Sequence, residues 1–469
     1  MRPRHEDKIV FDLLCCIQEQ ASDLEVKFEE FRSIHHALKH GDCLCANRLT
    51  GGLTNYSYKV YLKKSPEISL FAKISLPRAL WDTSKESHYD VDRTRKEFSM
   101  MELFARLAPG HVPTPYVCQP LDEKMILLTQ YCKNDEQLSQ QLIKGVTDFR
   151  VWKGLAKSIA QLHCIDFDPE FNAGIRTTML PTFKTLGNKL ESMLDDISCA
   201  SRTTKTVQEL GQKKCQTLVD NIQYQYLNAR DCLVHSDLHV KNILVERMSL
   251  NKKGHVFGPT GAFSVCDWEM GFAGPIGRDL GTLFAFPLCC ALSHALNGNI
   301  GATCDILDCI ELTWEMYAQT LREGGKDESF VGHAFCSIVG WCGRFMFQGF
   351  YTSGNHVEDF PVDNEKDKEL LLDTVGVFGI KFMHWAFGES DDVIKKSGER
   401  FDMFKLSILH EIAIIISLKA SIDSSYMSYG RELSCTRSDH SNGLRKLFRY
   451  PAGRSVSMDC GDISSSPYQ

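Results

Sequence analysis

The sequence predicts an α+β chain in two lobes, a small sheet-rich lobe followed by a large, mainly helical lobe. Three observations carry this prediction. Short apolar runs separated by glycine and proline occupy residues 41–132, a pattern typical of strands. From about residue 134, apolar positions recur every three or four residues, which is typical of helices. A second group of short apolar runs, near residues 232–266, interrupts the helical pattern.

The first lobe is expected at residues 41–132, preceded by a helical extension at residues 1–40 with apolar positions at helical spacing. Within the lobe, strands are expected at residues 43–49, 55–62, 70–75 and 125–130. A helix is expected at residues 92–107. Pro113 and Pro115 then favour an extended connection, because proline cannot continue a helix.

The second lobe is expected at residues 133–432. Helices are predicted at residues 149–163, at 183–229 with a polar break near 198–206, and from 279 to about 425. Strands are predicted at residues 232–235, 243–245 and 263–266. Residues 433–469 are rich in Ser, Arg and Gly with few large apolar side chains, so they predict a disordered tail.

Composition excludes several classes of protein. The 469 residues carry 53 Lys and Arg against 60 Asp and Glu, a net charge of −7, which argues against a general nucleic-acid binder. No apolar run follows the N-terminal charges, so a cytoplasmic location is expected. The apolar stretches at 281–296 and 408–422 contain His, Glu or Lys and predict buried helices rather than membrane spans.

The cysteines are numerous but irregular. There are 19, with no Cys-x-x-Cys pair, so reduced thiols packed as small apolar groups are the favoured interpretation. Structural zinc is the alternative, although zinc ligands normally come in close pairs.

The first motif is a strand, a glycine turn and a second strand around Gly51-Gly52, with Asn55 following. Glycines let the backbone approach a ligand closely, and the free amides of such a turn suit phosphate oxygens. An ordinary hairpin gives the same pattern, so this motif is weak when taken alone.

The second motif is Val234-His235-Ser-Asp237-Leu-His239-Val-Lys-Asn242, a polar cluster between two apolar runs. An Asp followed five residues later by Asn is what a phosphotransferase catalytic loop requires: the Asp orients or deprotonates the acceptor hydroxyl and the Asn binds metal. Two alternatives stay open. One is a metal site through His235, Asp237 and His239, and the other is a loop whose histidines make only hydrogen bonds.

The third motif is a short apolar strand that ends in Asp267-Trp-Glu269 and a glycine-rich stretch. Two carboxylates at a strand end suit Mg²⁺, which prefers oxygen ligands and phosphate. A solvated acidic turn is the alternative.

Together with the lone strand lysine Lys73 and the helix glutamate Glu97, the three motifs stand in the order of a kinase fold, in which such a lysine contacts phosphates and such a glutamate holds the lysine.

Over roughly residues 42–350 the chain resembles the protein-kinase-like small-molecule phosphotransferases, a group that includes aminoglycoside, choline and methylthioribose kinases. His235-Ser-Asp237-Leu-His239 resembles the His-Gly-Asp-Leu-His of that group. Methylthioribose kinases carry Asp-Pro-Glu-Phe and then Gly-Pro-Met-Gly-Phe-Asp-Ile-Gly. Here the corresponding stretches are Asp267-Trp-Glu269-Met and Gly274-Pro-Ile-Gly277-Arg278-Asp279-Leu-Gly281.

The resemblance implies a role for each matching residue. Asp237 matches the catalytic base and Lys73 the phosphate-contacting lysine, which Glu97 would hold. The glycine-rich loop corresponds to Gly51, Gly52 and Asn55, and the metal ligands to Asp267, Glu269 and Asn242.

The chain also departs from methylthioribose kinases. Asn242 stands where those kinases generally have Ser, Trp268 replaces Pro, and Arg278 replaces an aromatic residue. Of the paired arginines in their C-terminal lobe, only Arg344 lies in the comparable stretch. We expect His239, Arg278 and Arg344 to contact the acceptor.

The resemblance implies transfer of the γ-phosphoryl group from MgATP to a hydroxyl of a small molecule, with 5-methylthioribose of methionine salvage as the expected acceptor. The implied partners are ATP, Mg²⁺ and the acceptor, without nucleic acid or membrane, and a homodimer is allowed for. The alternatives are another acceptor, such as choline, ethanolamine, an aminoglycoside-like compound or another sugar, or a non-catalytic kinase-like binding protein. A metal-dependent hydrolase using His235 and His239 is a further alternative.

Overall fold

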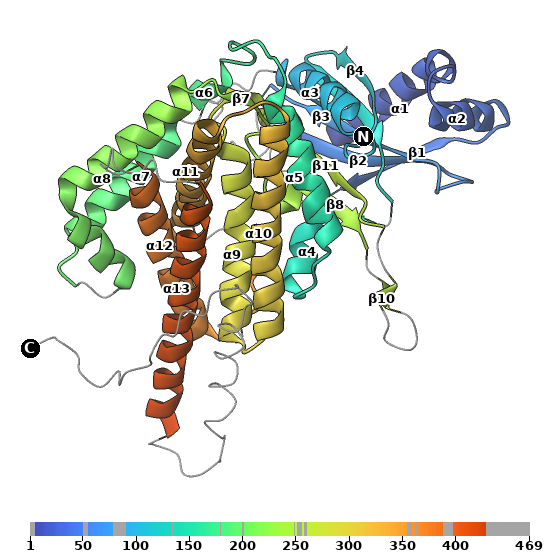
Figure 1. The fold of residues 1–469 in the computed structure, drawn as a ribbon. Helices are drawn as coiled ribbons and strands as arrows, with labels where there is room; N and C mark the ends of the chain where they lie inside the picture. The colour runs from blue at the N-terminus through green and yellow to red at the C-terminus, as the bar shows by residue number, and fades with distance from the viewer. Residues whose placement is uncertain are drawn as a thin grey trace, which may run out of the picture.

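The structure is a computed structural model, and it confirms the predicted two-lobed α+β fold, with a small antiparallel sheet and a largely helical remainder (Figure 1). It describes residues 5–49, 55–77, 91–133, 135–178, 180–198, 201–247, 249–250, 256–257, 260–353, 359–362, 364–387 and 397–427. Gly51, Gly52 and the predicted disordered tail at 433–469 therefore lie outside the described residues.

The first lobe, called the N-lobe below, is built on a five-stranded antiparallel sheet in the order β1-β2-β3-β5-β4. The strands are β1 (Leu44–Leu49), β2 (Asn55–Leu62), β3 (Ser69–Ser75), β5 (Lys124–Gln130) and β4 (Pro115–Leu121). Pro113 and Pro115 predicted only an extended connection where β4 lies. Pro115 is compatible with this strand because β4 stands at the sheet edge, where a missing N–H costs no ladder hydrogen bond.

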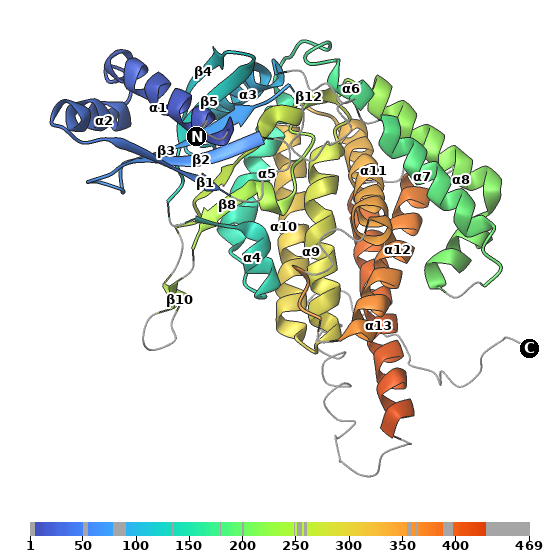
Figure 2. The ribbon, with the colours of Figure 1, turned by 180° about the vertical axis from the view of Figure 1, so that it is seen from behind.

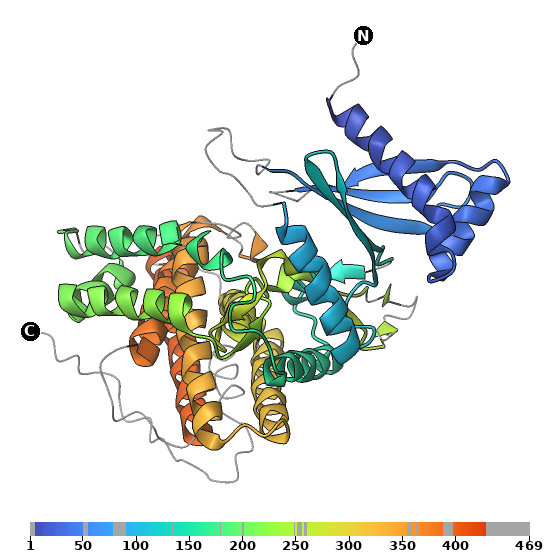
Figure 3. The ribbon, with the colours of Figure 1, turned by 90° about the horizontal axis from the view of Figure 1, so that it is seen from above.

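Two helices cover one face of this sheet, α1 (His5–Leu24) and α2 (Glu29–Lys39) (Figure 3). Side chains alternate across a strand, so Leu70, Ala72 and Ile74 of β3 join the core under these helices. Lys73 has the opposite parity and points to the other face, toward the second lobe. Alternation along one strand thus separates the structural face of the N-lobe from its functional face.

The helix α3 (Arg93–Leu107) lies on that other face and packs into the core of the second lobe. Met100, Met101 and Phe104 of α3 are buried there with Leu127 of β5. Because α3 belongs to both units, it carries Glu97 to the boundary between the lobes.

The second lobe, called the C-lobe below, is a layer of long helices (Figures 1 and 2). Its helices are α4 (Leu138–Ile143), α5 (Phe149–Cys164), α6 (Ile175–Thr178), α7 (Leu180–Leu194), α8 (Arg202–Asn228), α9 (Arg278–Leu296), α10 (Ile300–Glu323), α11 (Glu328–Phe345), the π-helical turn η3 (Met346–Thr352), α12 (Glu365–Phe387) and α13 (Ser397–Met427). The expected polar break separates α7 from α8. Gly211, with φ of 78°, also kinks α8.

Short strands sit beside the helices; those at 232–234, 243–246 and 263–265 were predicted from the sequence and the others were not. β8 (Ile243–Glu246) pairs with β11 (Phe263–Val265) and with β6 (Asp135–Gln137), while β7 (Cys232–Val234) pairs with β12 (Phe272–Gly274). A separate hairpin joins β9 (Ser249–Leu250) and β10 (Val256–Phe257).

Within the described part of the chain, three helices are long and apolar enough to cross a membrane by length and composition: Arg278–Leu296, Glu328–Thr352 and Glu365–Phe387. The apolar stretch at 281–296 lies in a helix that meets this length, because α9 begins at Arg278. The most apolar segment of Arg278–Leu296 is completely buried inside the fold. The corresponding buried shares are 78% for Glu328–Thr352 and 61% for Glu365–Phe387. These helices form the C-lobe core, as the sequence predicted for 281–296.

Candidate active site

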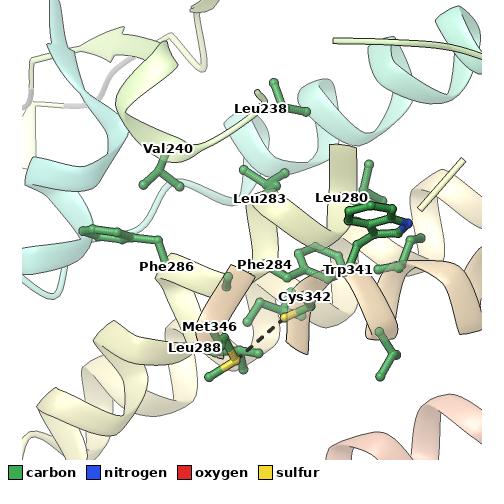
Figure 4. Close-up of a cluster of buried hydrophobic side chains, with 14 of the residues drawn as sticks. Leu238, Val240, Leu280, Leu283, Phe284, Phe286, Leu288, Trp341, Cys342 and Met346 are labelled. Carbon is green, nitrogen blue, oxygen red and sulfur yellow. Dashed lines mark hydrogen bonds between the residues drawn. The ribbon is translucent and has the colours of Figure 1, made fainter. Parts of the chain in front are cut away.

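The loop after β7 carries the predicted catalytic residues and is held by alternate apolar side chains. Leu238 and Val240 are fully buried in the same hydrophobic core as Leu283 and Phe286 of α9 (Figure 4). Val240 begins the 3-10 turn η1 (Val240–Asn242), which leads into β8. Asp237 keeps a partly exposed carboxylate, since 36% of its side chain is accessible.

A buried carboxylate fixes the backbone at the start of this loop. Asp279, in the first turn of α9, accepts hydrogen bonds from the backbone N–H groups of His235 at 2.8 Å and Ser236 at 2.7 Å. Its other partner is His163 Nε2 at 3.2 Å, and His163 Nδ1 lies 2.6 Å from the hydroxyl of Tyr317. Burial alone raises the pKa of Asp279, but these hydrogen bonds and the nearby histidines lower it overall. Asp279 therefore holds Ser236 in its left-handed conformation, with φ of 70°.

Asn242 lies beside Asp237, as the Asp-x4-Asn spacing predicted. Its Nδ2 donates to the backbone oxygen of Asp237 at 3.0 Å and lies 3.4 Å from the Asp237 carboxylate. The backbone oxygen of Asn242 accepts from the N–H of Cys266 at 2.8 Å. Since Asp267 follows Cys266, this hydrogen bond connects the catalytic loop to the Asp-x-Glu segment.

The alternative metal site through His235, Asp237 and His239 is not supported by the geometry. His235 Nε2 lies 2.9 Å from the backbone oxygen of Cys266, and its Nδ1 lies 3.3 Å from the N–H of Asp237, so both ring nitrogens have protein partners. His239 Nε2 lies 3.6 Å from the Asp237 carboxylate. Among the described residues these three do not form a group compact enough to hold a metal ion. The described cysteines form no such group either, and none of them is in a disulfide.

The lysine, the helix glutamate and the Asp-x-Glu pair meet at the boundary between the lobes. Lys73 Nζ lies 2.9 Å from Glu97 Oε2, 2.6 Å from Asp267 Oδ1 and 3.1 Å from Glu269 Oε2. Burial by itself lowers the pKa of Lys73, but the three carboxylates outweigh it and raise that pKa well above its usual value. Lys73 is therefore a permanent cation. It links β3 to Glu97 of α3 and to Asp267 and Glu269 of the C-lobe.

The carboxylates respond in opposite directions. Burial and the other two carboxylates raise the pKa of Glu97 to about 7 despite the contact with Lys73. For Asp267, burial acts upward, but the short contact with Lys73 lowers the pKa overall. Asp267 has φ of 65° and ψ of 59°, a left-handed conformation that brings its side chain back toward Lys73. Strain of this kind is characteristic of functional positions.

Arg93 is the member of this site that sequence analysis missed. Its Nη2 donates to Asn55 Oδ1 at 2.8 Å, and its Nε lies 3.4 Å from Glu269 Oε2. Asn55 Nδ2 in turn donates to Glu269 Oε2 at 2.9 Å. The available signal was spacing, because Arg93 precedes Glu97 by one helical turn and so lies on the same face of α3.

The residues present fit a hard divalent cation. Glu97, Asp267 and Glu269 each offer a carboxylate oxygen, and these oxygens all lie within 4.8 Å of one another. No other group of His, Cys, Asp and Glu in the described part of the chain meets this criterion. An all-oxygen donor set is what Mg²⁺ prefers.

Arg278 and Arg344 come together on the far side of the catalytic loop. Arg278 donates from Nε to the backbone oxygen of Ser236 at 2.9 Å and stacks over Trp341, its guanidinium carbon 4.9 Å from the ring centre. Arg344 donates to Thr182 at 3.1 Å and lies 5.5 Å from the same ring. Each arginine is only 4% exposed, and burial together with Arg278 lowers the pKa of Arg344 to about 9. No carboxylate pairs with either arginine among the described residues.

Comparison of the sequence with known protein families identifies the family of this chain. Residues 46–303, more than half of the chain, match the sequence model of the phosphotransferase enzyme family. The chain therefore belongs to this family, and it is a small-molecule kinase by class.

Individual proteins that the chain resembles have more specific names than the family. The chain is 23% identical over 421 residues to a methylthioribose kinase of Bacillus velezensis, covering 83% of this chain and 96% of that one. It is 29% identical over 164 residues to a methylthioribose kinase of Geobacillus kaustophilus, a match that covers 32% of this chain and only 37% of that kinase. A solved aminoglycoside 2′-phosphotransferase in complex with GDP is similar over 73% of this chain and 92% of that one, at 11% identity and a TM-score of 0.37.

Proposed function

We propose that this protein transfers the γ-phosphoryl group of ATP to a hydroxyl of a small sugar, with 5-methylthioribose as the first acceptor to test. The observation that carries the proposal is the convergence of Lys73, Glu97 and Asp267 in one cluster beside the loop of Asp237, with Lys73 and Glu97 buried and the Asp267 carboxylate 40% exposed. Positioning and charge neutralisation account for most of the catalysis of phosphoryl transfer, so such a cluster is what the reaction requires.

Each side chain has a role in this proposal. Lys73 binds phosphate oxygens and Glu97 holds it in place. Asp237 accepts the proton of the acceptor hydroxyl or orients that hydroxyl, and Asn242 keeps Asp237 in position. Asp267, Glu269 and Asn242 would hold Mg²⁺, which when bound neutralises charge on the phosphates. Gly51, Gly52 and Asn55 would cover the nucleotide from the N-lobe.

Two observations support the choice of acceptor. The relatives at 23% and 29% identity are methylthioribose kinases. Arg278 and Arg344 add a local positive field beside the catalytic loop, where a cation such as choline or ethanolamine would be repelled. Guanidinium donors suit sugar hydroxyls instead. The two arginines and His239 are the proposed acceptor contacts, and methionine salvage is the proposed context.

The non-catalytic alternative is disfavoured because the side chains that transfer would need are present: Lys73, Glu97 and Asp267 are in contact, and Asn242 lies against Asp237. Loss of such residues is what a binding module derived from a kinase would show. A cytoplasmic enzyme without a membrane or nucleic-acid partner remains the expectation from composition, and the oligomeric state is left to measurement.

The test is ATP consumption across a panel of acceptors with one batch of enzyme. The panel contains methylthioribose, ribose, an aminoglycoside, choline and ethanolamine, and protein carrying Asp237→Asn serves as the blank. We expect the highest kcat/KM with methylthioribose and none above the blank with the two cations. A preference for choline would overturn the acceptor, and no turnover with any compound would overturn the kinase proposal for this panel.

A further inference from the structure

Arg93 has no part in the proposed reaction, yet it is buried inside the charged cluster. Only 5% of the residue is exposed, at the first turn of α3. A buried guanidinium is held by specific partners or it is costly. Its partners here, Asn55 and Glu269, belong to opposite sides of the boundary between the lobes.

Three N-lobe donors converge on one C-lobe oxygen. Glu269 Oε2 lies 2.9 Å from Asn55 Nδ2, 3.1 Å from Lys73 Nζ and 3.4 Å from Arg93 Nε. Glu269 itself is in the 3-10 turn η2 (Trp268–Met270), directly after Asp267. The side-chain amide of Asn55 bridges Arg93 and Glu269, because it accepts from the first and donates to the second. Arg93, Asn55 and Glu269 therefore form a closed clasp between the lobes.

The charges explain why a second cation is needed. Glu97, Asp267 and Glu269 would leave a net charge of −2 if Lys73 were their only cation, whereas Arg93 brings the cluster to −1. Like charges at this separation disfavour ionisation of one another. Arg93 contacts Glu269 rather than Glu97 or Asp267, so its guanidinium orients the Glu269 carboxylate.

We propose that Arg93 is a positioning residue, which with Asn55 clasps Glu269 from the N-lobe and so couples lobe closure to binding of the magnesium–nucleotide complex. The inference rests on the proposed function, since it concerns the same metal-binding carboxylate. Residues that orient metal ligands typically change metal affinity or activity by about 10–100-fold when they are replaced.

The experiment compares three variants of the full chain with the parent protein. Arg93→Gln removes the charge, and Arg93→Lys keeps the charge but cannot reach two partners as a fork does. Arg95→Gln is the matched control, because Arg95 lies two residues along α3 with 57% of its side chain exposed. The readouts are the melting-temperature shift caused by MgATP without acceptor, and the Mg²⁺ concentration that gives half of that shift.

We expect Arg93→Gln to raise the half-effective Mg²⁺ concentration by about 10–100-fold, with Arg93→Lys in between and Arg95→Gln unchanged. In turnover, KM for MgATP should rise more than kcat falls. If Arg93→Gln lowers only the melting temperature of the ligand-free protein, and its Mg²⁺ and ATP dependence stays that of the parent, Arg93 is merely structural and the inference is wrong. If the parent protein itself gains no stability from MgATP, the proposed function fails, and that result is distinct from loss in the variant alone.

Discussion

Two buried groups of charges flank the catalytic loop, and they are built on opposite principles. The cluster between the lobes sets two cations, Lys73 and Arg93, among three carboxylates at distances of 2.6–3.4 Å. The cluster behind the loop sets Arg278 and Arg344 against aromatic rings, without a carboxylate partner among the described residues. In the first group each charge has an opposite charge in contact with it, and in the second group neither arginine has one in the described part of the chain.

The difference shows how stability and function divide in this molecule. A compensated cluster contributes to holding the lobes together before any ligand binds, because breaking a buried ion pair leaves an uncompensated charge. An uncompensated pair of arginines costs stability that cation–π contacts offset only in part. Such a pair is retained for a partner outside the chain, which here we propose to be the acceptor.

The largest expected effect is on the residue between the two clusters. Asp237→Asn should reduce kcat by about 10²–10⁴-fold, because it removes the proton acceptor while keeping the shape of the side chain. Binding of MgATP, followed by its melting-temperature shift, should be unchanged because neither cluster is touched. Near-normal turnover in this variant would remove Asp237 from the proposed role.

The comparison itself is tested by the same substitution in each cluster. Arg93→Met should cost about 3–5 kcal/mol of unfolding free energy, since Glu269 would lose a buried countercharge. Arg344→Met should leave the unfolding free energy unchanged or raise it by about 1–4 kcal/mol, because the cost of burying an unpaired charge disappears. Denaturant titration measures both values. Equal destabilisation by the two variants would contradict the distinction between the clusters.

A smaller effect is expected in the pH dependence of stability. Glu97 has a pKa raised from 4.5 to about 7, so the folded protein binds this proton more tightly than the unfolded chain does. Stability from this group is therefore fully present below pH 4.5 and is lost as the pH rises through 7. Melting temperatures in chelator should fall over this interval for the parent protein relative to Glu97→Gln. Parallel curves would show that Glu97 does not bind its proton more tightly in the folded protein than in the unfolded chain.

The smallest effect is expected from removing residues 436–469, a segment far in sequence from both clusters and outside the described residues. Its composition offers few apolar side chains to a core, so the melting temperature and kcat/KM should barely change. A large drop in either quantity would show that the segment docks on the folded protein.

Most of the fold and half of the site could be predicted from local pattern. Alternation and glycine breaks predicted the strands of the N-lobe, and helical spacing predicted α3 and α5. The strand β4 was missed, because proline propensity opposes a strand unless the position is at an edge, and edges are set by the pairing of distant segments. The start of α9 was predicted to within one residue, at 279 against Arg278 in the structure.

The sequence by itself determined which chemical groups are available and in what order, since Lys73, Glu97, Asp237 and Asp267 stand in motifs that span only a few residues each. Only the tertiary structure decided which of them share a charge environment. Asn55, Arg93 and Glu269 are separated by up to 214 residues, yet they meet within 3.4 Å because the lobes close on one another. Spacing along the chain carries no information on such a contact, for it depends on how α3 and the sheet pack against the C-lobe.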